Sequence, residues 1–208
     1  DRGCDAVTLD EIAAAAGVSK MTVLNYFARK EDLMLDREDD LQLAPFREAL
    51  RARPAGEAPV ATLRRVVDAL RAAGHPIVRV DGNIVAWWRV VAASPAMQAR
   101  LREHADAAAD AVADALAGAA ADGVAHLAAG LVVLTVRTAR AAALRVVERG
   151  GSAKKADAAF ADVVDHGLRA VDALLAAPAK ASAQPSSTPA RAPSKAPSKP
   201  SPRAKRSR

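Results

Sequence analysis

Residues 7–33 of this 208-residue chain read VTLDEIAAAAGVSKMTVLNYFARKEDL and contain the clearest helix and turn signals of the sequence. Thr8 and Glu11 have the Ser/Thr-x-x-Glu spacing of a capping box, in which each side chain bonds the other residue's backbone amide at a helix start. The apolar residues that follow recur at helical spacing. They predict the inner face of a first helix: Leu9, Ile12, Ala13 and Ala16.

A tight turn and a second helix come next. Gly17 ends the first helix, because a left-handed backbone conformation costs glycine little. We expect Val18 to be a buried plug in the turn and Ser19 to cap a helix over about residues 20–27. The inward side chains of this second helix are Val23 and Phe27.

Two short helices joined by a glycine turn predict a helix-turn-helix, whose second helix enters the DNA major groove. A small motif rarely exposes methionine and leucine together, and in a groove both side chains can contact thymine methyl groups. Lysine and asparagine beside them offer hydrogen bonds to base edges or phosphates. The outward stripe is Lys20, Met21, Leu24 and Asn25.

The chain here resembles the TetR family, whose DNA-binding signature it matches over about residues 1–36. The matching runs are Ile12-Ala13, Ala16-Gly17-Val18-Ser19, Tyr26-Phe27 and Lys30-Glu31-Asp32-Leu33. The family most often has a tyrosine where this chain has Leu24, so one polar contact is replaced by an apolar one. The expected DNA-contacting residues are Thr8, Ser19, Lys20, Met21, Thr22, Leu24, Asn25, Tyr26 and Lys30.

The resemblance also implies a mechanism. A homodimer would place two recognition helices on a palindromic operator, and a small-molecule effector bound in a helical domain would release the DNA, so that the protein acts as a repressor. The family has a further helix before the motif, and Asp1-Arg2-Gly3 resembles the end of that helix. Since the chain starts at Asp1 rather than at methionine, we expect its beginning to be missing.

Composition predicts an all-α protein. Hydrophobic residues make up 51% of the chain but aromatic residues only 3%. Much of the apolar content is alanine, which is the best helix former. No stretch alternates with period two, so no strand is expected. We predict three parts: a homeodomain-like helix-turn-helix over residues 1–36, a helical effector-binding and dimerisation domain over 37–177, and a disordered tail over 178–208.

Two long helices are expected in the second part, over about residues 124–147 and 152–176, because each has an amphipathic stripe. They suit a four-helix interface with a second copy, and we expect the homodimer through about 124–149 and 152–176. The sequence leaves open whether they instead close only the core of their own chain.

An effector pocket is expected among these helices. Trp87 and Trp88 lie in a predicted helix over residues 83–93, and aromatic walls suit a small apolar ligand. His126 and Thr135 interrupt an otherwise apolar helix. The alternatives are that the tryptophans are core or interface residues and that the polar pair makes local hydrogen bonds. The expected pocket residues are Trp87, Trp88, Val91, His126, Leu131 and Thr135.

The tail carries the net charge. Residues 178–208 hold eight basic residues and no acidic one, which leaves 22 basic against 24 acidic residues in the body. A tail rich in Pro, Ser, Ala and Lys cannot bury enough apolar surface to fold. It can either solvate the chain or add salt-sensitive, non-specific DNA affinity. A second hypothesis is therefore an architectural DNA-binding protein driven by the tail, and a third is a small-molecule-binding protein with impaired DNA reading.

Other classes have little support in the sequence. Cys4 is the single cysteine, so the chain cannot form an internal disulfide, and a cytoplasmic setting is the simplest. The four histidines are far apart without a second ligand at helical spacing, so no metal site is expected. We expect no cofactor, no enzymatic activity and no membrane partner, since the longest charge-free stretch of the body, 123–136, has 14 residues.

Overall fold

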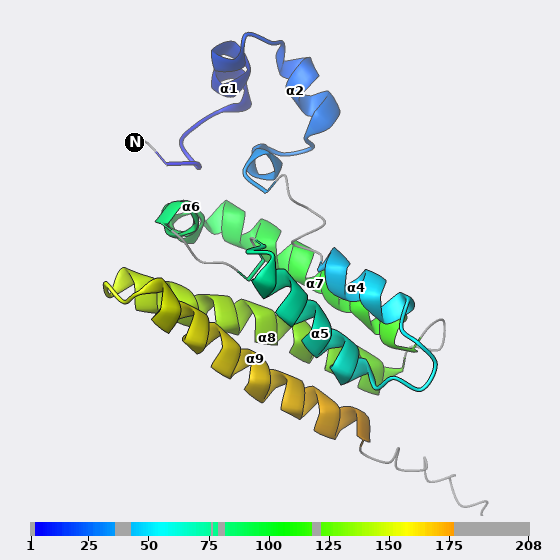
Figure 1. Cartoon of the computed structure of the whole chain (residues 1–208). Coiled ribbons are helices and arrows are strands. Elements are labelled where there is room, and N and C mark those ends of the chain that lie inside the picture. Colours follow the sequence, from blue (N-terminus) through cyan, green and yellow to red (C-terminus); the bar gives the residue numbers. More distant parts are fainter. Residues whose placement is uncertain (1–2, 36–42, 76, 79–81, 118–121, 177–208) are drawn as a thin grey trace, which may run out of the picture. The chain divides into compact units, whose positions relative to one another are not determined.

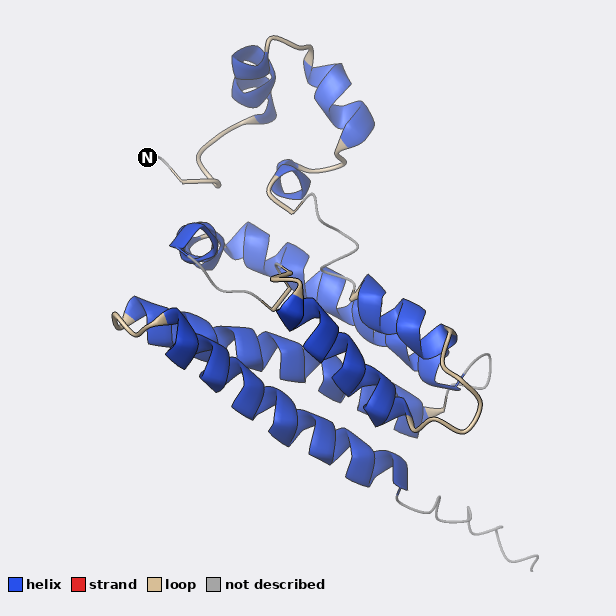
Figure 2. Ribbon diagram, in the orientation of Figure 1, coloured by secondary structure: helices blue, strands red, loops and turns tan. Residues whose placement is uncertain are grey.

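The computed structural model describes residues 3–35, 43–75, 77–78, 82–117 and 122–176. Within these ranges it contains eight α-helices, one 3₁₀ helix and no strand, which confirms the all-α prediction (Figure 2). Residues Asp1–Ala177 form one compact unit. The predicted tail over 178–208 and the boundary at residues 36 and 37 lie outside the described residues, and both stay predictions.

The N-terminal part holds three short elements, α1 (Leu9–Ala16), α2 (Lys20–Tyr26) and the 3₁₀ helix η1 (Lys30–Leu33). Two helices of eight and seven residues enclose little volume, and each buries a single side chain, Ala13 in α1 and Val23 in α2. The pair α1 and α2, which we call the helix pair, therefore depends on its turns and caps more than on a core of its own.

The body is a bundle in which the described helices run from α4 (Ala44–Arg51) to α9 (Ala153–Ala176) (Figure 1). Between them lie α5 (Pro59–Ala72), α6 (Gly82–Ala93), α7 (Pro95–Ala117) and α8 (Gly123–Glu148). The predicted helices over 83–93, 124–147 and 152–176 are confirmed with small shifts at their ends. Proline or glycine stands at each break between successive helices from α4 to α9.

The α8 and α9 helices lie side by side and form the main packing unit of the body (Figure 1). Apolar residues of both fill one core with α4, α5 and α7, including the fully buried Phe46, Leu63, Val132 and Phe160. Gly167 of α9 lies directly against Thr135 of α8, so a glycine sets how closely the two backbones approach.

In the described part of the chain, α8 is the one helix that is long and apolar enough to cross a membrane by length and composition. It nevertheless packs against α6, α7 and α9 and carries Arg137, Arg140 and Arg145 in its second half. Nine of its residues are buried inside the bundle. We therefore describe α8 as the central helix of this bundle.

Candidate functional site

The helix pair begins and turns as its sequence predicts. The amide of Thr8 donates to Oε2 of Glu11 at 2.8 Å, and the amide of Glu11 donates to Oγ1 of Thr8 at 3.3 Å, so the capping box is complete. Gly17 ends α1 with a φ of 68°, in the left-handed region that glycine adopts readily. Oγ of Ser19 accepts the amide of Thr22 at 3.0 Å and starts α2.

The turn itself differs from the prediction at one residue. Val18 was expected to be a buried plug, but its side chain is 42% exposed. The prediction was wrong because the described neighbours of Val18 are two helices too short to cover it. Local spacing predicts where the turn lies, whereas burial depends on what packs over it.

The outward stripe of α2 is open to solvent. Met21 is 64% exposed and Tyr26 is 79% exposed, while Asn25 is exposed and Leu24 is half-buried. Nζ of Lys20 lies 2.8 Å from Oδ2 of Asp10 in an exposed ion pair. Such a pair contributes little stability, so a phosphate can replace the carboxylate at small cost.

Lys30 has a structural role that the sequence did not suggest. Its ammonium group has three donors, and they reach the carbonyl oxygens of Cys4, Asp5 and Val7 at 3.0, 3.0 and 3.1 Å. These bonds clamp the segment before α1 to the start of η1. The expected phosphate contact stays a prediction, and it would require Lys30 to give up at least one carbonyl.

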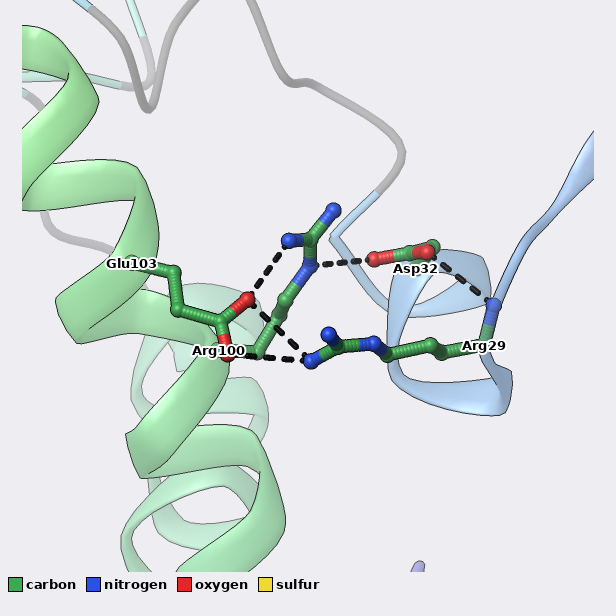
Figure 3. A network of polar contacts seen from close by, with 4 residues as sticks. All are labelled: Arg29, Asp32, Arg100 and Glu103. Atoms are coloured by element: carbon green, nitrogen blue, oxygen red, sulfur yellow. Dashed lines mark hydrogen bonds and ion pairs between the residues drawn. The ribbon is translucent and has the colours of Figure 1, made fainter.

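A network of four charged side chains joins η1 to α7 (Figure 3). Arg100 donates through Nε to Oδ1 of Asp32 at 2.7 Å and through Nη1 to Oε2 of Glu103 at 2.8 Å. Nη1 of Arg29 donates to both oxygens of Glu103, at 3.0 and 3.1 Å. The hydrogen bonds from Arg100 and Arg29 lower the pKa of Glu103, so its carboxylate stays charged in weak acid.

A small second core lies beside this network. Leu35, Val91 and Met97 are buried together, with both tryptophans packed against them. Nε1 of Trp87 donates to the carbonyl oxygen of Met34 at 3.2 Å. The end of the N-terminal part is therefore held by α6 as well as by α7.

The body contains a cavity of about 350 Å³ between α6, α7 and α8. Arg140 of α8 lies over the ring of Trp88, 5.4 Å from the ring centroid, and donates through Nη2 to the carbonyl oxygen of Ile77 at 3.0 Å. The described lining residues are Leu43, Trp88, Leu101, His104, Ala105, Val133, Leu134, Val136, Arg137, Thr138, Arg140, Ala141, Leu144 and Arg145.

Of the six expected pocket residues, Trp88 lines this cavity and the other five lie apart from it. Trp87 and Val91 belong to the second core. His126 is exposed, with Nδ1 of its ring 3.0 Å from the carbonyl oxygen of Asp122. Leu131 is half-buried against the main core, and Oγ1 of the buried Thr135 donates to its carbonyl oxygen at 2.7 Å. Both polar side chains thus make the local hydrogen bonds that the sequence left open.

The sequence reading missed the arginines of the cavity. A signal was available, since Arg137, Arg140 and Arg145 interrupt an apolar helix at three- to five-residue steps and share one side of it. The contribution of α7 carried no such signal. Leu101, His104 and Ala105 face the cavity because of how α7 packs, and their spacing is that of any core helix.

Comparison with known proteins supports the reading of the N-terminal part. Residues 1–36 match the family model described as bacterial regulatory proteins, tetR family. No curated protein and no solved structure matches the chain. The matched segment contains α1, α2 and η1, which have the helix-turn-helix caps, turn and exposed second helix described above. Residues 1–36 therefore resemble the DNA-binding segment of TetR-family regulators, and this match indicates a DNA-binding transcription regulator.

Proposed function

We propose that this regulator is a cytoplasmic, ligand-released repressor that binds a palindromic operator as a homodimer. One observation carries the proposal, and it concerns α7. Arg100 and Glu103 bond to the N-terminal part, while Leu101, His104 and Ala105 on the same turns line the cavity. A ligand that shifts these turns of α7 would change the cavity lining and the contacts with the N-terminal part at the same time.

The release step follows from this linkage. A ligand changes DNA affinity only if it binds the two conformations of the protein unequally. A cavity next to the network allows such a difference, because its filling and the position of α7 are coupled. In a dimer, the two α2 helices would enter successive major grooves roughly 34–36 Å apart, so a small displacement of each changes the fit to both half-sites.

The homodimer is supported by an apolar stripe on α8. Leu127 is 60% exposed and Leu134 is 55% exposed, and Leu131 between them is half-buried. We call these three residues the leucine stripe. Leucines at three- and four-residue steps on one helix suit packing against a second copy of the same helix, with α9 beside it.

Fluorescence anisotropy of labelled DNA tests whether the helix pair recognises a specific DNA sequence. The DNA upstream of the gene is compared with a shuffled duplex at several salt concentrations. We expect the intact chain to prefer the upstream DNA, and we expect Lys20→Ala or Asn25→Ala to reduce that preference about tenfold, since one lost base contact has this magnitude, whereas a lost phosphate contact would weaken binding to both duplexes alike. Lys154→Ala, an exposed lysine at the start of α9, is the matched control and should leave it unchanged.

A chain ending at Ala177 separates this function from an architectural one. If the shortened chain keeps its preference, the helix pair reads the sequence and the tail is an accessory. If all binding leaves with residues 178–208, whose eight basic residues favour a steep salt dependence, the architectural hypothesis replaces the proposal.

A further inference from the structure

Among the described residues that line the cavity between α6, α7 and α8, the fixed charges are all positive. Arg137, Arg140 and Arg145 line it, and none of the lining residues that the structure describes is an aspartate or glutamate. Arginine is the residue best suited to bind a carboxylate, because its planar fork donates two parallel hydrogen bonds. A cation in this cavity would meet only repulsion from these groups.

Much of the cavity lining is apolar, although the buried His104 also belongs to it. Leu101, Ala105, Val133 and Val136 form part of its lining, and Trp88 adds an aromatic face. A volume of about 350 Å³ is at the small end of ligand pockets. The occupant must therefore be small, with an apolar body that displaces water from this lining.

The arginines differ in how they are held. Arg140 is half-buried, stacked on Trp88 and bonded to the carbonyl oxygen of Ile77, so it is fixed before any ligand arrives. Arg137 and Arg145 are exposed, and neither makes an ion pair with a described carboxylate. They stand two turns apart on α8, with Ala141 between them. This arrangement places charge at the edge of the cavity and apolar surface within it.

We propose that the cavity binds an amphipathic organic carboxylate, with its ring or short chain against Trp88 and its carboxylate at Arg137. This inference rests on the proposed function, of which it names the effector class. Because Arg137 is exposed, its contact is screened by solvent, and we expect a preference for the acid over a neutral analogue of about fivefold.

Tryptophan fluorescence of the full chain provides the test, since the chain has two tryptophans and one of them lines the cavity. The probes are 4-phenylbutyrate and its neutral amide, which has nearly the same shape. We expect saturable binding of the acid, with a dissociation constant about fivefold below that of the amide. Arg137→Gln should abolish the difference. Arg149→Gln, an exposed arginine at the end of the same helix and outside the cavity, should keep it.

Equal binding of acid and amide, no binding of either at millimolar concentration, or equal effects of the two arginine variants would each overturn the inference. The operator assay separates this failure from failure of the proposed function. If the acid binds with the expected preference but does not release specific DNA, the proposed ligand class is supported and the proposed release of DNA by the ligand is contradicted. If specific DNA is bound but the acid binds no more tightly than the amide, DNA recognition by the helix pair is supported and the proposed ligand class is contradicted.

Discussion

At the scale of single residues, Gly167 governs the approach of α8 and α9. A Cβ at this position would meet Oγ1 and Cγ2 of Thr135 well inside van der Waals contact. Thr135 is β-branched and bonded to the carbonyl oxygen of Leu131, so it cannot turn aside freely. Overpacking of this kind costs about 1–3 kcal/mol, against about 1 kcal/mol gained from helix propensity. Gly167→Ala should lower the free energy of unfolding in urea by up to about 2 kcal/mol.

Two variants check the cause. Gly130→Ala introduces the same group on α8, where nothing lies within 4 Å of the added Cβ, and it should be neutral or stabilising. In Gly167→Ala combined with Thr135→Ala, the two closest atoms, Oγ1 and Cγ2, are removed and only Cβ of residue 135 remains, so the clash is reduced and the double variant should be more stable than the sum of the two single effects predicts. If the free-energy changes of the two single variants simply add up in the double variant, the contact with Thr135 is not the cause of the destabilisation by Gly167→Ala.

At Thr62, a substitution is expected to stabilise the protein. The side chain of Thr62 is fully buried, and its Oγ1 has no hydrogen-bond partner among the residues that the structure describes. A buried hydroxyl without a partner costs about 1–3 kcal/mol, and valine has nearly the same shape. Thr62→Val should therefore raise the free energy of unfolding by about 1 kcal/mol, measured by urea denaturation. Thr62→Ser keeps the hydroxyl and leaves a small void, so stabilisation by both variants would contradict this reason.

Residue-level predictions from the sequence succeeded where the cause is local. The caps at Thr8 and Ser19 and the turn at Gly17 depend on residues within four positions, and all three are confirmed. The burial expected for Val18 and the pocket position expected for Thr135 were not found, because burial and pocket lining depend on helices distant in sequence. The role of Lys30 depends on carbonyl groups more than 20 residues away, which no local pattern reports.

At the scale of elements, the network of Arg29, Asp32, Arg100 and Glu103 should limit the opening of η1. The side chains of Arg100 and Asp32 are mostly buried where they meet, so their hydrogen bond is only partly screened. Arg100→Ala should make the amide of Leu35, at the end of η1, exchange with solvent about fivefold faster, which corresponds to about 1 kcal/mol of local opening. Arg102→Ala changes an exposed neighbour on α7 and should leave this rate unchanged.

The same network predicts a response to acid. Hydrogen bonds from Arg100 and Arg29 hold the pKa of Glu103 below its ordinary value of 4.5. A lowered folded pKa means that the contact is fully present above pH 4.5 and is lost as the pH falls through the lower, folded value. Carboxyl NMR titration should give a midpoint for Glu103 below 4.5, and Arg100→Ala should raise it. A midpoint at or above 4.5 in the intact chain would show that the network does not hold in solution.

Element positions were predictable because proline and glycine punctuate the chain and the longer helices have apolar stripes. The bounds of α8 and α9 fall within a residue or two of those expected. Which helices enclose the cavity was not predictable, because helical spacing gives the inner face of α7 without naming the helix that faces it. The tryptophan pair shows this, since Trp88 lines the cavity while its neighbour Trp87 packs against the N-terminal part.

At the scale of the whole molecule, the leucine stripe predicts self-association. Leu127 and Leu134 are exposed and Leu131 between them is half-buried, which is costly for a monomer, and α9 covers only one side of α8. A second copy that buries the stripe would gain roughly 25 cal/mol for each Å² of apolar surface removed from water. We therefore expect the protein to run as a dimer in size-exclusion chromatography with light scattering at micromolar concentration.

The double variant Leu127→Lys, Leu134→Lys should be monomeric, because each dimer would bring charged ammonium groups into an apolar interface. Both positions are more than half exposed, so the monomer should keep its helical circular dichroism. Val90→Lys adds the same charge at an exposed valine on α6 and should remain dimeric. The monomeric variant should also lose affinity for the operator, since a single helix pair contacts only one half-site. An intact chain that is monomeric at these concentrations, or a double variant that is still dimeric, would contradict dimerisation through the stripe.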